Sequence, residues 1–64
     1  MKKYVVTARY GHAYECIPFT SLWAAKLYAK STNKRVVQII NITTGEIVFE
    51  RNIVTGSIEI DVED

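Results

Sequence analysis

Residues 19–31, FTSLWAAKLYAKS, decide the fold, because this is the one stretch of the chain whose pattern favours a helix. Thr20 or Ser21 can accept a hydrogen bond from a backbone N–H of the first turn, and Leu, Ala and Lys dominate the residues that follow. Neither candidate cap is followed three residues later by Glu or Gln, so no capping box fixes the start. The sequence predicts one helix that begins at one of these two residues.

This helix is apolar around most of its circumference. Its apolar residues are Leu22, Trp23, Ala24, Ala25, Leu27, Tyr28 and Ala29. The only charged residues, Lys26 and Lys30, are four apart and are expected to share one narrow exposed strip. One small sheet cannot cover so wide an apolar surface. We therefore expect either Trp23 with Leu27, or Tyr28 with the alanines, to meet something else.

Two interpretations of the surplus apolar surface stay open. In the first, the rings of Trp23 and Tyr28 close the core while their polar atoms reach solvent at its rim. In the second, Trp23 and Leu27, with Tyr28 as a weaker third, are anchors for a second copy or another protein, since small alanines beside a large aromatic residue allow close approach. We predict Trp23, Leu27 and Tyr28 as interface residues of a homodimer that also binds another protein.

Two strands are expected before the helix. Residues 2–10 alternate with period two, which predicts a strand whose core side holds Tyr4, Val6, Ala8 and Tyr10. Gly11 and His12 favour a tight turn, and residues 13–17 can return as a second strand. Pro18 lacks an N–H donor, so it is expected to end that pairing and lead into the helix.

Two or three strands are expected after the helix. The helix is expected to stop in the polar residues 32–34, where Asn33 tolerates a left-handed conformation. Residues 35–42, RVVQIINI, are apolar on both faces, which favours a central strand. A turn at residues 43–45 leads to a strand over residues 46–51 with Ile47 and Phe49 on one face. Residues 55–64 are either an edge strand or a frayed acidic tail.

The order of these elements predicts a small two-layer α+β domain, an antiparallel sheet of four or five strands packed on one helix. With 64 residues the whole chain, 1–64, is expected to form a single domain near the lower size limit for a stable core, which favours oligomerisation. No apolar run approaches the roughly 18 residues of a membrane span, and no signal peptide is evident. We expect a cytoplasmic protein without membrane contact.

The charges are unevenly distributed along the chain. Residues 1–35 carry seven basic residues and one acidic residue, whereas residues 36–64 carry one basic residue and six acidic ones. If they converge, basic side chains of the first half could neutralise the phosphates of a nucleic acid: Lys2, Lys3, Arg9, Lys34 and Arg35. Nucleic-acid binding is therefore the alternative function.

Enzymatic chemistry is not indicated by the sequence. His12 and Cys16 are four apart, but a turn and a strand are expected between them, and no third residue is evident that would orient the pair. A single cysteine excludes an internal disulfide and any zinc site built from several thiolates. Gly45 and Gly56 stand alone, so no Gly-rich phosphate loop exists. We expect no catalytic residue, no cofactor and no metal.

In its general character, a compact single domain without appended signals, the chain resembles short accessory proteins encoded by phages and mobile elements. The resemblance implies a protein that binds a host enzyme or defence complex and changes its activity, for example as an inhibitor. An acidic partner surface could then imitate nucleic-acid phosphates: Glu59, Asp61, Glu63 and Asp64. The predicted function is a non-enzymatic protein–protein interaction module.

Overall fold

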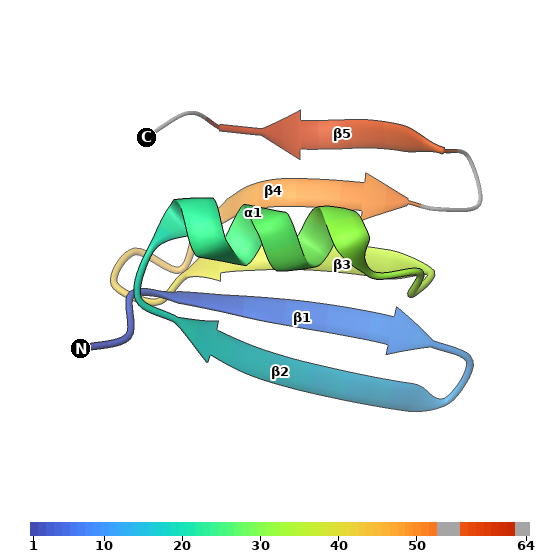
Figure 1. Cartoon of the computed structure of the whole chain (residues 1–64), viewed down its shortest axis with the longest axis horizontal. Coiled ribbons are helices and arrows are strands. Elements are labelled where there is room, and N and C mark those ends of the chain that lie inside the picture. Colours follow the sequence, from blue (N-terminus) through green and yellow to red (C-terminus); the bar gives the residue numbers. More distant parts are fainter. Residues whose placement is uncertain (53–55, 63–64) are drawn as a thin grey trace.

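A five-stranded antiparallel sheet carries one helix on one of its faces (Figure 1). The computed structural model describes residues 1–52 and 56–62. The elements are β1 (Tyr4–Tyr10), β2 (Ala13–Phe19), α1 (Leu22–Ser31), β3 (Val36–Asn41), β4 (Ile47–Asn52) and β5 (Ser57–Asp61). The strand order is β2-β1-β3-β4-β5, with every neighbouring pair antiparallel. The predicted α+β fold is confirmed, and residues 57–61 form a strand rather than a tail.

The core lies between α1 and the sheet. Its buried residues are Tyr4, Val6, Ala8, Leu22, Ala25, Ala29, Val37, Ile39, Val48 and Phe49. The helix contributes only three of them, one leucine and two alanines, so small side chains bring α1 close to the central strands β1 and β3. The predicted core side of β1 is confirmed for Tyr4, Val6 and Ala8, whereas Tyr10 at the strand end is exposed.

The chain passes from β2 into α1 through a short connection. Pro18 lies inside β2 opposite Val5, so the prediction that it ends the strand is wrong. The strand continues because β2 is at the edge of the sheet, where alternate N–H groups point away from the neighbouring strand and a missing donor removes no ladder bond. Ser21 is the helix cap, and its Oγ accepts the Ala24 N–H at 3.1 Å.

The C-terminal end of α1 is closed by a side chain from β4. The Arg51 guanidinium donates hydrogen bonds to the backbone carbonyls of Lys30 and Thr32. A cation at this position also suits the negative end of the helix dipole. Thr32 is extended, and no described residue other than glycine has a positive φ. The helix therefore stops within residues 32–34, as predicted, but Asn33 does not use the left-handed conformation that it tolerates, and Arg51 supplies the donors to the last carbonyls instead.

A β-bulge in the β3–β4 pair corrects another prediction. Phe49 lies opposite Ile39, but Ile47 lies opposite Ile40, so Val48 is the extra residue of the bulge. Because Ile39 and Ile40 point to opposite faces, Ile47 and Phe49 do too, and the prediction that they share a face is wrong. The bulge allows both Val48 and Phe49 to be buried.

The turn between β3 and β4 is closed by Asn41. Its Oδ1 accepts the N–H groups of Thr43 at 2.9 Å and Thr44 at 3.2 Å. Gly45 adopts a φ of 78° and donates its N–H to the Asn41 carbonyl at 2.7 Å. The predicted turn at residues 43–45 is confirmed.

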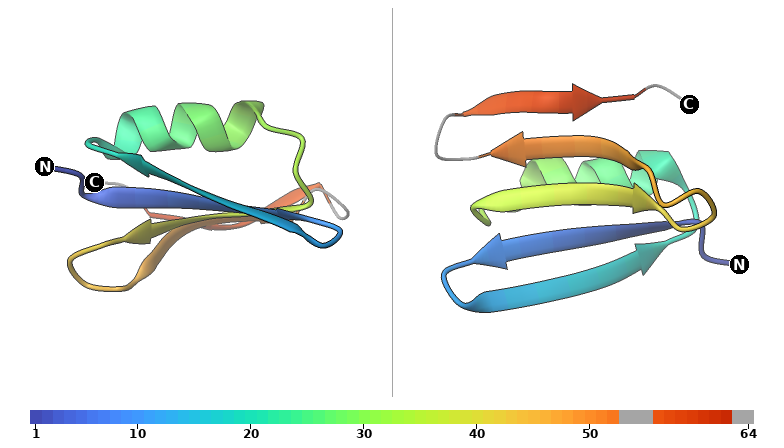
Figure 2. Two further views of the ribbon diagram at one scale, coloured as in Figure 1. Left: turned by 90° about the horizontal axis from the view of Figure 1, so that it is seen from below. Right: turned by 180° about the vertical axis from the view of Figure 1, so that it is seen from behind.

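The face of the sheet opposite α1 carries no second layer in the described part of the chain (Figure 2). The register places Pro18, Val5, Ile40 and Ile47 side by side across four strands on this face. The next row includes Gln38, whose Nε2 donates to Glu50 Oε2 at 2.6 Å. The hydrophobic core thus lies on the helix side of the sheet, and the opposite face is mixed apolar and polar.

Candidate functional site

The outward side of α1 carries two large apolar residues. Trp23 is 74% exposed and Leu27 is 52% exposed, and their spacing of four residues places them on one side of the helix. The opposite side holds the buried residues Leu22, Ala25 and Ala29. We call Trp23 and Leu27 the helix ridge. The structure thus separates the two interpretations of the apolar surplus: the alanines face the core, and Trp23 does not close it.

Tyr28 lies on the flank of α1 that faces β2. Its ring centroid is 5.7 Å from that of Phe19, and its hydroxyl donates to Glu15 Oε1 at 2.7 Å. This hydrogen bond, with partial burial, raises the pKa of the Tyr28 hydroxyl above its ordinary value of 10.0. Of the three predicted interface residues, Tyr28 is half-buried within its own domain, so only Trp23 and Leu27 project from it.

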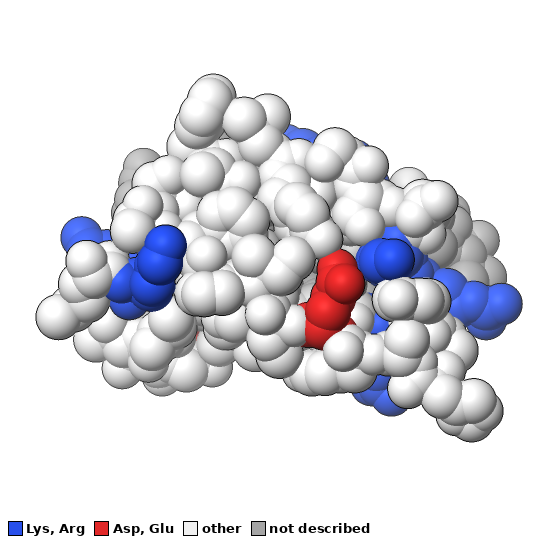
Figure 3. Space-filling view, turned by 60° about the horizontal axis from the view of Figure 1, so that its bottom comes forward, with Lys and Arg blue, Asp and Glu red and all other residues white. Residues whose placement is uncertain are grey.

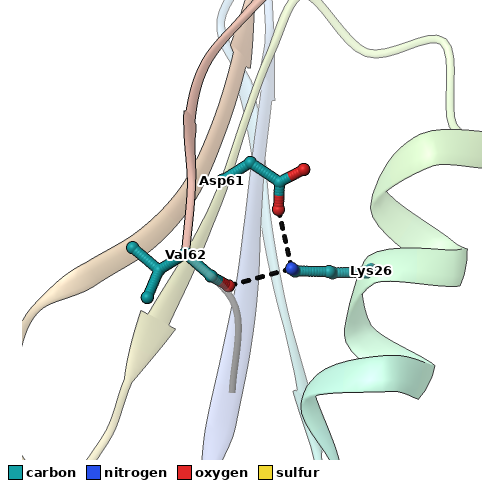
Figure 4. A network of polar contacts seen from close by, with 3 residues as sticks. All are labelled: Lys26, Asp61 and Val62. Atoms are coloured by element: carbon teal, nitrogen blue, oxygen red, sulfur yellow. Dashed lines mark hydrogen bonds and ion pairs between the residues drawn. The ribbon is translucent and has the colours of Figure 1, made fainter.

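The other flank of α1 is tied to β5 by Lys26 (Figure 4). Its Nζ lies 2.6 Å from Asp61 Oδ1 and donates to the Val62 carbonyl at 2.9 Å. The ammonium group lowers the pKa of the Asp61 carboxyl. Lys26 and Lys30 therefore do not share one exposed strip, since Lys26 is directed to β5 and Lys30 is exposed.

The predicted acidic surface is only partly present among the described residues. Glu59 is exposed on β5, but the Asp61 carboxylate is already paired with Lys26. Glu63 and Asp64 lie outside the described residues. An Asp61 engaged with its own domain offers less free negative charge to a partner than the sequence alone suggests.

The helix ridge is held on a rigid support. Ser21 caps the start of α1, Arg51 binds its last carbonyls, and Tyr28 and Lys26 fix its two flanks. The backbone of a helix held in this way is ordered before binding, which reduces the entropy that association removes. Trp is also among the residues that most often dominate binding energy at protein interfaces.

The predicted basic residues occupy two separate ends of the molecule. Lys2 and Lys3 precede β1, whereas Arg9 lies near its end, about 20 Å away at the usual rise of a strand. Lys34 and Arg35 join Arg9 there, with the Arg35 N–H donating to the Arg9 carbonyl at 2.9 Å. The Lys34 ammonium also lies 3.7 Å from the centre of the Tyr10 ring. Figure 3 shows basic groups towards both ends, with mostly uncharged surface between them.

His12 and Cys16 are not joined into a pair by any contact in the structure. His12 lies in the turn between β1 and β2, and Cys16 is an exposed residue of β2 opposite Thr7. The described residues contain neither a pocket nor a group of three or more His, Cys, Asp and Glu side chains that could hold a metal. The absence of enzymatic activity stays a prediction.

Sequence reasoning missed Glu15 and Arg51. Glu15 is the only charged residue of β2, and in the β1–β2 register it lies opposite the buried Ala8, on the side of the helix. Arg51 similarly lies opposite the buried Val37. Both residues could have been found from the sequence, because each is a charged residue at a core-side position of a predicted strand. A charged side chain at such a position needs a polar partner.

Among the described residues, no helix has the length and apolar character required to cross a membrane. Comparison of the chain with known protein families, curated proteins and solved structures finds no match.

Proposed function

We propose that this chain is a non-enzymatic protein–protein interaction module that binds its partner through the helix ridge, Trp23 and Leu27. The observation that supports it most is the 74% exposure of Trp23 on a helix whose caps and flanks are fixed. Exposed apolar residues are common singly, but a tryptophan next to a leucine on an ordered helix is a suitable anchor for an apolar groove. Trp23 and Leu27 are the two large apolar residues of α1 that are exposed.

The partner we propose is a protein of the cytoplasm. The resemblance to accessory proteins of phages and mobile elements suggests a host enzyme or defence complex, whose activity the bound module would reduce. Recognition would use a helix-in-groove contact, in which side chains four residues apart enter one hydrophobic groove. Lys30, which is exposed on the same helix, would lie at the polar rim of such a contact.

The test compares three single substitutions in the tagged protein. Trp23→Ala and Leu27→Ala remove the ridge, and Ile42→Ala is the control, because Ile42 is 50% exposed in the β3–β4 turn and so matches Leu27 in type and exposure. Proteins captured from host lysate are compared with and without nuclease. The expected result is a stoichiometric, nuclease-resistant protein that the unmodified chain and Ile42→Ala retain and Trp23→Ala loses.

The captured protein is then purified and titrated. Truncation of an interface anchor typically costs about 2 kcal/mol, so Trp23→Ala should weaken binding about thirtyfold. Equal affinity for the unmodified chain and a Trp23→Ala/Leu27→Ala double variant would refute the ridge as the binding surface.

Nucleic-acid binding is the second candidate function. It is favoured by one observation, the grouping of Arg9, Lys34 and Arg35 at one end of the sheet next to Tyr14, which lies opposite Arg9 and is 60% exposed. Retention of oligonucleotide at low salt, with a steep loss as salt rises and a weaker slope after Lys34→Glu/Arg35→Glu, would support it. No retention at 50 mM salt would exclude it.

A further inference from the structure

The free edge of β2 differs from that of β5. β2 has seven residues and only one charge, Glu15, whose carboxylate already accepts the Tyr28 hydroxyl. β5 has five residues, and two of them are acidic. Figure 3, with the β2 side turned forward, shows mostly uncharged surface there. A long edge with little charge is a template for pairing with another strand, whereas acidic residues discourage it.

The hydrogen bonds of the sheet show which backbone groups of β2 point outward. The Arg9 carbonyl in β1 accepts the Arg35 N–H, just before β3, at 2.9 Å, so odd-numbered residues of β1 direct their backbone groups towards β3. On the other side, the Phe19 carbonyl of β2 accepts the Lys3 N–H at 3.0 Å and so points towards β1. Even-numbered residues of β1 therefore bond to β2, and the register places the odd-numbered residues of β2 opposite them. Tyr14, Cys16 and Pro18 consequently direct their backbone groups away from the sheet. The presence of a proline among these three agrees with this, because its missing N–H leaves the β1–β2 ladder complete.

We propose that two copies of this chain pair their β2 edges antiparallel about a two-fold axis at Cys16, which joins the two sheets into one of ten strands. In this register Tyr14 of each copy lies opposite Pro18 of the other. Four inter-chain hydrogen bonds form, from the Tyr14 N–H to the Pro18 carbonyl and from the Cys16 N–H to the Cys16 carbonyl, each in both directions. The exposed rings of Tyr14 and Pro18 cover each other on the open face of the sheet.

The neighbouring registers are less favourable. An axis at Glu15 places two carboxylates directly opposite each other, which is destabilising in a cross-strand pair. An axis at Ile17 pairs Cys16 with Pro18 and leaves only the two bonds from the Cys16 N–H groups, because Pro18 has no N–H and Tyr14 faces Thr20, beyond the end of β2. The Cys16 axis also lacks the two bonds that Pro18 cannot donate, but it keeps four others within the strand and places Glu15 opposite Ile17.

The choice of β2 over β5 follows from charge and symmetry. Two β5 strands paired with each other would bring Glu59 and Asp61 of one copy close to the same residues of the other. A β2-to-β5 contact would leave one free edge of each kind and continue into a filament. The β2-to-β2 contact closes after two copies. Because its axis is perpendicular to the sheet, both helices lie on the same face, and the dimer presents two helix ridges in one direction.

The dimer is tested by light scattering of the pure, untagged chain from 1 to 200 µM. The expected mass rises from 7.3 kDa to twice that value. Directly opposed residues of a hydrogen-bonded pair have Cα atoms about 5.5 Å apart, which is within disulfide range. Oxidation with diamide, which takes up the two thiol hydrogens, should therefore give a Cys16–Cys16 dimer that dithiothreitol reverses.

Two substitutions at Cys16 separate the backbone contact from the thiol. Cys16→Ala should remain dimeric without the disulfide. Cys16→Pro removes only an outward N–H, as Pro18 already does, so it should fold and raise the dimer dissociation constant about thirtyfold, the equivalent of two hydrogen bonds. Cys16→Glu, which places two carboxylates at the axis, is the second disrupting variant and should regain dimer at high salt.

A monomeric mass at every concentration overturns the dimer, and so does a dimer that Cys16→Pro and Cys16→Glu both leave unchanged. The proposal does not depend on the helix ridge. A monomer whose partner binding still requires Trp23 would reject the β2 dimer and keep the proposed function. A dimer whose partner binding does not require Trp23 would keep the β2 dimer and reject the proposed function.

Discussion

Lys26 Nζ lies 2.6 Å from Asp61 Oδ1, so a single ammonium group connects the middle of α1 to the edge strand β5. The contact joins the basic half of the sequence to the acidic half. α1 packs mainly on β1, β2 and β3, and β5 has β4 as its one neighbouring strand. Lys26 therefore links the helix to a strand that lies outside the area the helix covers.

The ion pair should be visible in the titration of Asp61. The hydrogen bond from Lys26 holds the pKa of this carboxyl below its ordinary value of 3.8. The ionised Asp61 carboxyl thus contributes to stability above its ordinary pKa, and this contribution is lost as the pH falls through the lowered pKa of the folded state. Lys26→Met should return the pKa, measured by NMR, towards 3.8. Lys30→Met is the control, and an equal shift in both variants would contradict a specific contact.

The Tyr28–Glu15 hydrogen bond predicts a dependence of stability on alkaline pH. Because the folded-state pKa of Tyr28 is raised above 10.0, its contribution is complete below that pH and is lost as the pH rises through the raised value. Tyr28→Phe should lower the free energy of unfolding by about 1 kcal/mol at pH 7 and weaken this dependence. Urea unfolding measures both, with Tyr14→Phe as an exposed control. Identical alkaline profiles for the two variants would refute the prediction.

Arg51 should be required for the stability of α1. Arg51→Met removes two hydrogen bonds from a charged donor to the last carbonyls of the helix and should lower the free energy of unfolding by about 2 kcal/mol. Arg51→Lys should recover only part of the loss, because an ammonium group lacks the planar fork of guanidinium. Urea unfolding followed by circular dichroism tests both. Full recovery by lysine would show that charge alone stabilises the helix end.

Trp23 should contribute little to folding. At 74% exposure its truncation to alanine should change the free energy of unfolding by less than about 0.5 kcal/mol. Phe49, which is fully buried, provides the contrast, since Phe→Ala in a core costs about 3–5 kcal/mol. Thermal unfolding of the two variants measures the difference. A large loss on Trp23→Ala would make Trp23 a structural residue.

The elements were predictable from sequence because their signals are local. Alternation in residues 4–10, the Ser21 cap and the turn at Gly45 depend on residues close together in the chain. The core side of β1 followed from the same alternation. The fifth strand was an open alternative, because five alternating residues at an acidic terminus also suit a tail.

Three of the corrected details depend on contacts between residues that are distant in the sequence. Whether Pro18 ends a strand depends on which strand is at the edge, which no local pattern reveals. The end of α1 depends on Arg51 in β4, which is 21 residues after Lys30, the residue whose carbonyl it binds. The opposite faces of Ile47 and Phe49 depend on a bulge set by packing of Val48 and Phe49. For the candidate site, the sequence predicted Trp23 and Leu27 as interface residues. Only the structure shows that the alanines of α1 face the core and that Tyr28 is half-buried, which leaves Trp23 and Leu27 as the helix ridge.

The central position of β1 has a consequence for the newly made chain. β2 is made directly after β1 and can pair with it at once, but the second neighbour of β1, β3, leaves the ribosome only after the whole helix has been made. During that interval β1 is an open edge on a two-stranded hairpin, which is marginal in water without further packing. The helix is made before β3 and can cover the apolar side of this hairpin. From β3 onward each new strand joins the side of the sheet that was completed last, so synthesis and sheet growth proceed in the same direction.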